Sequence, residues 1–226
     1  MAAAETSEPP ATVYRVARQD GALRHSRITP ADNRTGGAGN RYDVVGGGVL
    51  YAASTARTCF AETMSRFRPT PAMRELLREA DPEEPQFMIC GGVPQDWRLK
   101  RRIFDLEISN PLPFLDVENP STLTHLEEEL GQELLALGYQ GNLDLSDIRN
   151  RDRRLSRAIA AWAYTAQDDV GTPLYSGVRY CSRVQDSQEC WAIFEGTQVN
   201  VAKRRSIELS NADMKAVAQP WHLRPF

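Results

Sequence analysis

Charged and hydroxyl side chains stand in or beside several short apolar segments of this sequence. These residues are Arg15 in YRVAR, Tyr51 in VLYAA, Glu62 on the flank of an apolar helical stripe, and Ser182 at the end of GVRYCSR. An arginine suits a phosphate group because its planar guanidinium is permanently charged and donates paired hydrogen bonds. A carboxylate stabilises positive charge that develops on a sugar carbon when a glycosidic bond breaks. Taken singly, each residue also has an ordinary structural interpretation as an exposed charge, a core aromatic or a surface hydroxyl.

The sequence carries no other catalytic signature. The glycine-rich segments 36–39, 46–48 and 91–92 match neither the P-loop nor the dinucleotide-binding pattern, and we interpret them as turns. There is no HExxH and no GxSxG, and His25, His125 and His222 do not form a helically spaced pair. We therefore predict neither a metal ion nor a bound cofactor.

The composition indicates a globular domain without a general affinity for polyanions. Of 226 residues, 41% are hydrophobic, and 27 Lys and Arg against 30 Asp and Glu give a net charge of -3. This charge argues against nucleic acid and anionic membranes as partners, so any anion site must be local. We expect Cys59, Cys90, Cys181 and Cys190 to be buried, reduced thiols because they form no CxxC pair. The sequence has no signal-peptide pattern and no membrane-spanning stretch, which predicts a cytoplasmic location.

Hydrophobic periodicity predicts an α+β domain around a small mixed β-sheet, with a helical insertion in the middle of the chain. Strands are expected at residues 12–17, 49–53, 87–93, 103–108, 177–183 and 190–196, the last two as a hairpin. Helices are expected from the N-cap Ser54 to Phe67, over 71–80, from Asn119 and Pro120 to Gly138 with a Thr124–Glu127 capping box, and over 151–167. We divide the chain into a frayed tail at 1–11, a domain at 12–199 with a helical insertion at about 94–167, and a peripheral C-terminal arm at 200–226.

The order of the candidate residues resembles the RES-domain family, toxins of bacterial toxin–antitoxin pairs named for arginine, glutamate and serine. The pattern is an arginine in a first strand, a second arginine after a loop, a strand of the type LYxA, a helical glutamate eleven residues after the strand tyrosine, and a later strand ending in serine. The matching residues are Arg15, Arg41, Tyr51, Glu62 and Ser182, and the resemblance covers about residues 14–197. This chain departs from the family in its longer, more helical segment from 94 to 167 and in its cysteine at 181, where proline is frequent.

The resemblance implies a fold similar to ADP-ribosyltransferases and an activity that destroys NAD at its nicotinamide–ribose bond, by hydrolysis or phosphorolysis. NAD is then a substrate and not a cofactor. Glu62 is expected to act at the ribose, and Arg15 and Arg41 to bind the diphosphate. Tyr51 would contact the nicotinamide, and Ser182 would bond the ribose or place the acceptor.

The same resemblance points to further residues around the pocket. Tyr42 and Tyr180 are expected to line the pocket, and Arg183 or Arg179 to supply a cationic site if inorganic phosphate is the acceptor. The resemblance also implies an antitoxin protein that covers the NAD pocket, and homodimers are common in the family.

Three other functions remain open from the sequence. A mono-ADP-ribosyltransferase would use the same pocket and modify a protein target. A non-enzymatic module would bind a partner through the amphipathic stretch 122–137. A toxin that targets nucleic acid would rest on Arg98, Lys100, Arg101 and Arg102 and on the segment 149–157, although such short basic runs are usually solvated.

Overall fold

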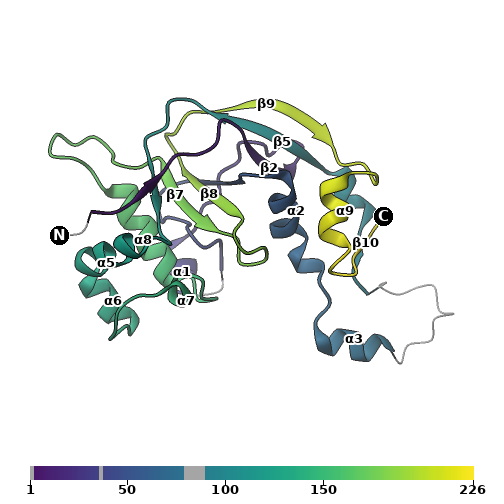
Figure 1. Ribbon diagram of the computed structural model, residues 1–226, viewed down its shortest axis with the longest axis horizontal. Coiled ribbons are helices and arrows are strands. Elements are labelled where there is room, and N and C mark those ends of the chain that lie inside the picture. Colours follow the sequence, from purple (N-terminus) through teal and green to yellow (C-terminus); the bar gives the residue numbers. More distant parts are fainter. Residues whose placement is uncertain (1–2, 36–37, 79–89) are drawn as a thin grey trace.

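The computed structural model describes residues 3–35, 38–78 and 90–226, and its centre is an eight-stranded sheet (Figure 1). The strand order is β1-β6-β7-β8-β3-β2-β5-β9, and among these described strands all neighbours are antiparallel except β6 and β7. Two short strands, β4 and β10, pair separately in parallel. The strands are Thr6–Ser7 (β1), Val13–Arg18 (β2), Val49–Ala53 (β3), Gly92–Val93 (β4), Arg101–Ile108 (β5), Phe114–Asp116 (β6), Gly177–Cys181 (β7), Glu189–Phe194 (β8), Val199–Ser206 (β9) and Arg224–Pro225 (β10). Together with the helices, this mixed sheet confirms the predicted α+β class.

The helices form two groups in Figure 1, one beside β7 and the other beside β2 and β5. Within the first group α8 packs on β7 and on α6, and within the second α9 packs on α2. The helices are Pro30–Asn33 (α1), Ala56–Met64 (α2), Pro71–Arg78 (α3), Gln95–Leu99 (α4), Pro120–Glu129 (α5), Gly131–Leu137 (α6), Leu145–Ile148 (α7), Arg154–Thr165 (α8) and Ala212–Ala218 (α9), with one 3-10 turn at Ser65–Phe67 (η1). No helix in the described part of the chain is long and apolar enough to cross a membrane.

Local hydrogen bonds explain where the predicted helices begin and end. The N-cap of α2 is Thr55, whose side chain accepts a hydrogen bond from the Thr58 amide, and not the expected Ser54. Asn119 caps α5 and Pro120 occupies its first turn, so the expected Thr124–Glu127 box is not used. The predicted long helix is divided at Leu130 and ends at Gly138 in the left-handed conformation (φ 94°).

Both chain ends are part of the folded domain, in contrast to the prediction from the sequence. The expected frayed tail contains β1, and the backbone of Glu5 bonds to Asp116 and to the Thr122 hydroxyl. At the other end, β9 is the edge strand of the sheet, and Met214 and Val217 of α9 are buried in the main core. The boundary at 199/200 therefore cuts through β9, and the C-terminal segment is not a peripheral arm.

The expected helical insertion at 94–167 also contains sheet. Strands β5 and β6 lie within it, so its continuous helical part is α5 to α8. The amphipathic stretch 122–137 turns its apolar face inward, since Leu123, Leu126, Leu130 and Leu134 are buried. This burial favours a core-packing role for the stretch over a partner-binding one. Of the strand expected at 87–93, residues 87–89 lie outside the described residues, as do residues 79–80 of the helix expected at 71–80.

The sheet divides between β2 and β3, and this division positions the site. Strand β2 pairs with β5 at six residues but with β3 only at Tyr14 and Ala53. Beyond that pair the two strands diverge. Helix α2 begins shortly after β3 and packs against both β2 and β3. The Cys59 thiol of α2 lies at this fork and donates a hydrogen bond to the Tyr14 carbonyl at 2.9 Å. A space lined by β2, β3 and α2 results.

The four cysteines are free thiols, and Cys59, Cys181 and Cys190 are buried as expected. Cys90 is partly exposed, so the prediction of burial is wrong for this residue. Burial raises the pKa of Cys59 to about 12, although backbone hydrogen bonds oppose the shift. Among the described residues, no group of three His, Cys, Asp or Glu side chains could hold a metal ion.

Candidate active site

A cavity of about 610 Å³ opens where β2 and β3 diverge, and its described lining is strongly cationic. One carboxylate, Glu62, faces six arginines: Arg15, Arg24, Arg27, Arg41, Arg153 and Arg183. The protein as a whole is acidic, so this concentration of guanidinium groups is local. A pocket with this charge favours an anionic ligand.

Glu62 is held by Ser182, which the sequence places 120 residues away. Glu62 stands on the exposed face of α2, and the Ser182 hydroxyl donates to its Oε1 at 2.6 Å. The same hydroxyl oxygen accepts hydrogen bonds from the amides of Val184 (3.2 Å) and Gln185 (3.1 Å). Because both amides fix the serine oxygen, its O–H points at the carboxylate. Ser182 is only 2% exposed and does not line the cavity, so it positions Glu62 and does not reach the cavity itself.

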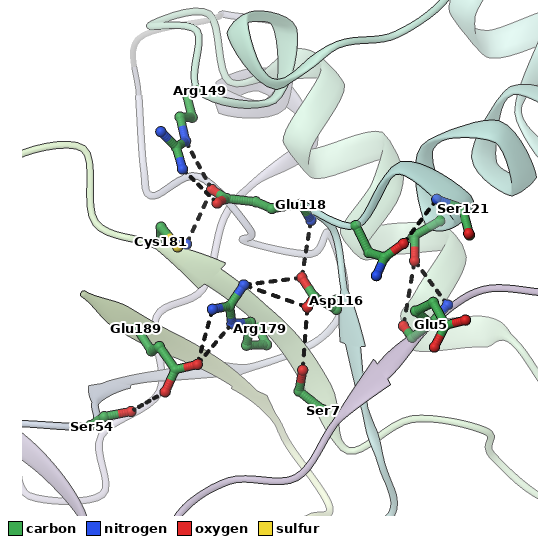
Figure 2. Close-up of polar contacts among 12 residues, drawn as sticks. Glu5, Ser7, Ser54, Asp116, Glu118, Ser121, Arg149, Arg179, Cys181 and Glu189 are labelled. Atoms are coloured by element: carbon green, nitrogen blue, oxygen red, sulfur yellow. Dashed lines mark hydrogen bonds and ion pairs between the residues drawn. The ribbon is translucent and has the colours of Figure 1, made fainter. Parts of the chain in front are cut away.

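The end of β7, directly before Ser182, is anchored by a largely buried ion pair (Figure 2). Glu118 accepts a hydrogen bond from the Cys181 amide at 3.1 Å and pairs with Arg149 at 2.7 Å. Burial alone would raise the pKa of Glu118, but the hydrogen bonds from Arg149 and Cys181 hold that pKa below its usual value. The ionised carboxylate thus fixes the residue next to Ser182. Sequence reasoning did not identify Glu118 or Arg149 as part of this support.

Arg15 is a partly buried cation with an unused donor. Its Nη2 donates to the Arg24 carbonyl at 2.8 Å, while its buried Nη1 has no partner within the described structure. Burial lowers the pKa of Arg15 to about 10, so the side chain still carries its charge at neutral pH. A ligand anion in the cavity would satisfy the free Nη1.

Arg41 lies in the cavity wall beside a pair of aromatic rings that contact each other. Its guanidinium carbon is 5.2 Å from the ring centroids of both Tyr42 and Tyr180. Its Nη2 donates to the Ile148 carbonyl at 2.6 Å and to the Tyr42 hydroxyl at 3.3 Å. These contacts leave Arg41 as a fixed positive charge at the wall with part of its donor capacity already used.

Tyr51 lines the cavity, whereas Tyr42 does not. The Tyr51 hydroxyl donates to Asp43 at 2.9 Å and accepts from the Tyr42 amide at 3.1 Å. Burial and the Asp43 carboxylate raise the pKa of Tyr51 well above its usual value, so the phenol stays protonated. Tyr42 is fully buried behind the wall, which contradicts its expected place as a lining residue, while Tyr180 lines the cavity as expected.

Asp43 is a structural residue of the site that sequence reasoning missed. Its Oδ2 accepts hydrogen bonds from the Ser26 hydroxyl at 2.9 Å and the Asn40 amide at 2.6 Å. It is 1% exposed and, through its other oxygen, holds Tyr51. An aspartate between Tyr42 and the apolar Val44 is the one sequence signal for this role, since buried carboxylates need partners.

Of the two arginines expected to bind a phosphate acceptor, one lies in the cavity and the other does not. Arg183 lines the cavity and donates to the Asn150 carbonyl at 2.9 Å. Arg179 does not line it, and instead pairs with Asp116 at 3.2 Å and Glu189 at 2.9 Å (Figure 2). Arg179 is therefore excluded from the cavity and joins β6, β7 and β8.

Several arginines of the basic segments considered for nucleic-acid binding form contacts within the protein instead. Arg98 is buried and donates to the carbonyls of Ile207 (2.9 Å) and Phe226 (3.0 Å). Arg149 pairs with Glu118, and Arg157 is buried against the backbone carbonyls of Asp32, Thr35 and Asn40. These side chains do not form a continuous basic surface, which disfavours the nucleic-acid interpretation.

The fold and the cavity define a class of protein: an α+β domain whose divided sheet holds an arginine-lined pocket around a serine-held glutamate. The model of the RES domain matches residues 12–215, and the chain therefore belongs to the RES-domain family. The match extends into α9, beyond the boundary expected at residue 199. No curated protein matches the chain. Among solved structures, a chain of the M. tuberculosis MbcT–MbcA toxin–antitoxin complex is similar, with a TM-score of 0.46 and 15% identity over 89% of this chain and 86% of that chain.

Proposed function

We propose that the protein is the toxin of a toxin–antitoxin pair and cleaves the nicotinamide–ribose bond of NAD. Family membership supports the class of protein, and the cavity supports the chemistry. The observation that carries the proposal is the 2.6 Å hydrogen bond from Ser182 to Glu62, which orients a lone carboxylate on the described wall of an arginine-lined cavity. An anionic dinucleotide with a cleavable sugar bond suits both features.

In this proposal Arg15 binds the diphosphate of NAD through its unpartnered Nη1. Tyr51 and Tyr180 line the same cavity, and their rings suit the flat nicotinamide. The nicotinamide ribose then lies against Glu62. Arg41 adds positive charge at the wall without giving up its internal contacts.

The reaction breaks the bond between the ribose carbon and the nicotinamide nitrogen, and the electron pair leaves with nicotinamide, which becomes neutral. Positive charge develops on the ribose, and the Glu62 carboxylate stabilises it. Water then adds to the carbon and releases a proton, which gives ADP-ribose. Inorganic phosphate in the same position would give ADP-ribose 1″-phosphate, and a protein side chain would become ADP-ribosylated.

The test is nicotinamide release from NAD by the purified protein, followed by chromatography. We expect Glu62→Gln to lower kcat by about 10²–10³-fold because it removes the charge that stabilises the ribose. Glu128→Gln, at an exposed position of α5 outside the cavity, is the matched control and should match the wild type. A folded Glu62→Gln protein with wild-type activity would remove the basis of the proposal.

The acceptor and the partner have their own tests. With labelled NAD and a cell lysate, label on a protein band identifies transfer to protein, and free ADP-ribose or its 1″-phosphate identifies NAD destruction. Family membership supports a cognate antitoxin, which should copurify on co-expression and inhibit NAD cleavage. A cytoplasmic location and a homodimer stay predictions, to be measured by fractionation and by light scattering.

A further inference from the structure

A second cavity, of about 430 Å³, adjoins the first one. The two share Arg15, Val16, Arg24, Glu62 and Thr63 in their linings, so Glu62 stands at the boundary between them. The second cavity extends along the outer half of β2 toward η1 and the start of β5. A group bound there would lie next to the carboxylate that the proposed reaction uses.

Three further arginines gather in this second cavity: Arg18 on β2, Arg66 on η1 and Arg101 on β5. Arg18 and Arg101 are direct cross-strand partners, an arrangement of like charges that disfavours the sheet. Burial lowers the pKa of Arg101, and the neighbouring charges of Arg66 and Arg18 lower it further. Repulsion of this kind is relieved when an anion binds between the three groups.

Within the described chain, none of these three arginines forms an ion pair with a carboxylate. Asp20 and Glu62 are the acidic residues of the described lining, against five arginines in total. The excess of positive charge is therefore not neutralised by the protein's own acidic groups.

Aromatic rings hold two of these guanidinium groups in place. Arg101 lies 5.1 Å from the Trp97 ring centroid and donates to the Trp97 carbonyl at 3.2 Å. Arg66 lies 4.8 Å from the Phe67 ring centroid, and Phe67 contacts Trp97 edge to face at 5.9 Å. Trp97 is 4% exposed, so this platform is part of the core. Arginines fixed in this way lose less conformational freedom when they bind an anion.

We propose that the second cavity is a phosphate-binding subsite of the same active site, formed by Arg18, Arg66 and Arg101. The proposal rests on the proposed function, because it places a second phosphate group, in addition to the diphosphate of NAD, beside Glu62. Several guanidinium groups around one space suit a compact dianion with three oxygens. Two sources have this chemistry: free inorganic phosphate and the 2′-phosphate of NADP.

Each source corresponds to a balanced reaction. Free phosphate bound beside Glu62 adds its oxygen to the ribose carbon as the bond to nicotinamide breaks, and nicotinamide departs with the electron pair. The 2′-phosphate of NADP takes no part in bond breaking and only strengthens binding, while water accepts the ribose. The first source makes phosphate a co-substrate, and the second makes NADP a substrate.

The experiment compares Arg66→Gln and Arg101→Gln with two matched controls, Arg57→Gln on the exposed face of α2 and Arg102→Gln, the neighbour of Arg101 on β5. Neither control residue is part of the described lining of either cavity. Cleavage is measured with NAD over a range of inorganic phosphate and with NADP in phosphate-free buffer. We expect each subsite variant to raise the KM for inorganic phosphate, or the KM for NADP, by about tenfold. The KM for NAD in phosphate-free buffer should change less than about twofold, and Arg101→Lys should recover part of the loss.

A binding measurement tests the subsite independently of the proposed NAD cleavage. Calorimetric titration of the Glu62→Gln protein with inorganic phosphate and with NADP measures binding without turnover. Weaker binding of either probe in the Glu62→Gln/Arg66→Gln double variant supports the subsite even if the wild-type protein cleaves no NAD. Equal binding and equal KM values in the subsite variants and the controls would overturn it.

Discussion

Arginine is used in opposite ways on the two sides of β7. In the network of Figure 2, Arg149 pairs with Glu118 and Arg179 pairs with both Asp116 and Glu189. In the cavity, Arg15, Arg41 and Arg183 bond to backbone carbonyls instead, and Arg41 also stacks on rings. A carboxylate partner neutralises a guanidinium, whereas a carbonyl or a ring only positions it.

The type of partner determines which arginines remain available to a ligand. The paired arginines of the network hold β6, β7 and β8 together and place Ser182. The cavity arginines keep a net positive charge at a fixed position. Arg27 tests the distinction, because it lines the cavity and yet forms an ion pair with Glu195.

Among the arginines of the two groups, the largest effect is expected at Arg15. Arg15→Gln removes a partly buried charge with a free donor, so the KM for NAD should rise by about 10–100-fold, with a smaller change in kcat. The steady-state kinetics of NAD cleavage measure this split, and the thermal midpoint checks the fold. If KM stayed at the wild-type value, Arg15 would belong with the structural arginines and would not bind the ligand.

Glu118→Gln should mainly affect stability. It removes the charge from a largely buried ion pair, and we expect a loss of about 1–3 kcal/mol in the free energy of unfolding, measured with urea at pH 7. Because the pKa of Glu118 is lower in the folded state, its contribution is present above its ordinary value of 4.5 and is lost as pH falls through the folded pKa. The difference between variant and wild type should therefore shrink on acidification below that value. A difference that grows on acidification would contradict the assigned direction.

Ser182→Ala should reduce catalysis without reducing binding. Loss of its hydrogen bond lets the Glu62 carboxylate move, so kcat should fall by about tenfold while the KM for NAD changes little. Ser182→Thr keeps the hydroxyl and should recover part of the activity. A rise in KM with unchanged kcat would instead mean that Ser182 contacts the substrate.

Arg27→Gln should have the smallest effect. Its ion pair with Glu195 is exposed, and such pairs contribute about 0–1 kcal/mol. Both KM and stability should stay within about twofold and 1 kcal/mol of the wild type. An effect on KM as large as that of Arg15→Gln would show that a carboxylate partner does not withdraw an arginine from the ligand.

Local patterns were sufficient to predict the α+β class, β2, β3, α2 and the β7–β8 hairpin, because these elements have clear periodicity. The chain ends contact distant segments: β1 pairs with β6, and α9 packs on α2. A local sequence pattern cannot predict such long-range contacts. The site shows the same limit. The candidate residues came from their order along the chain, whereas Asp43, Glu118 and the burial of Tyr42 depend on contacts across the fold.

The single pair that joins β2 to β3 leaves two strand edges inside the molecule. Unpaired strand edges normally recruit other strands, and proteins protect them with charge or by covering them. Here the Cys59 thiol bonds to the Tyr14 carbonyl at the fork, and its neutral state is favoured by a pKa of about 12. Ala52 and Ala53 of β3 line the cavity wall beside this thiol, and both residues are buried. Ser26 covers another part of the β3 edge through two backbone hydrogen bonds with Val49. The gap in the sheet is therefore closed to a further strand by contacts within the chain.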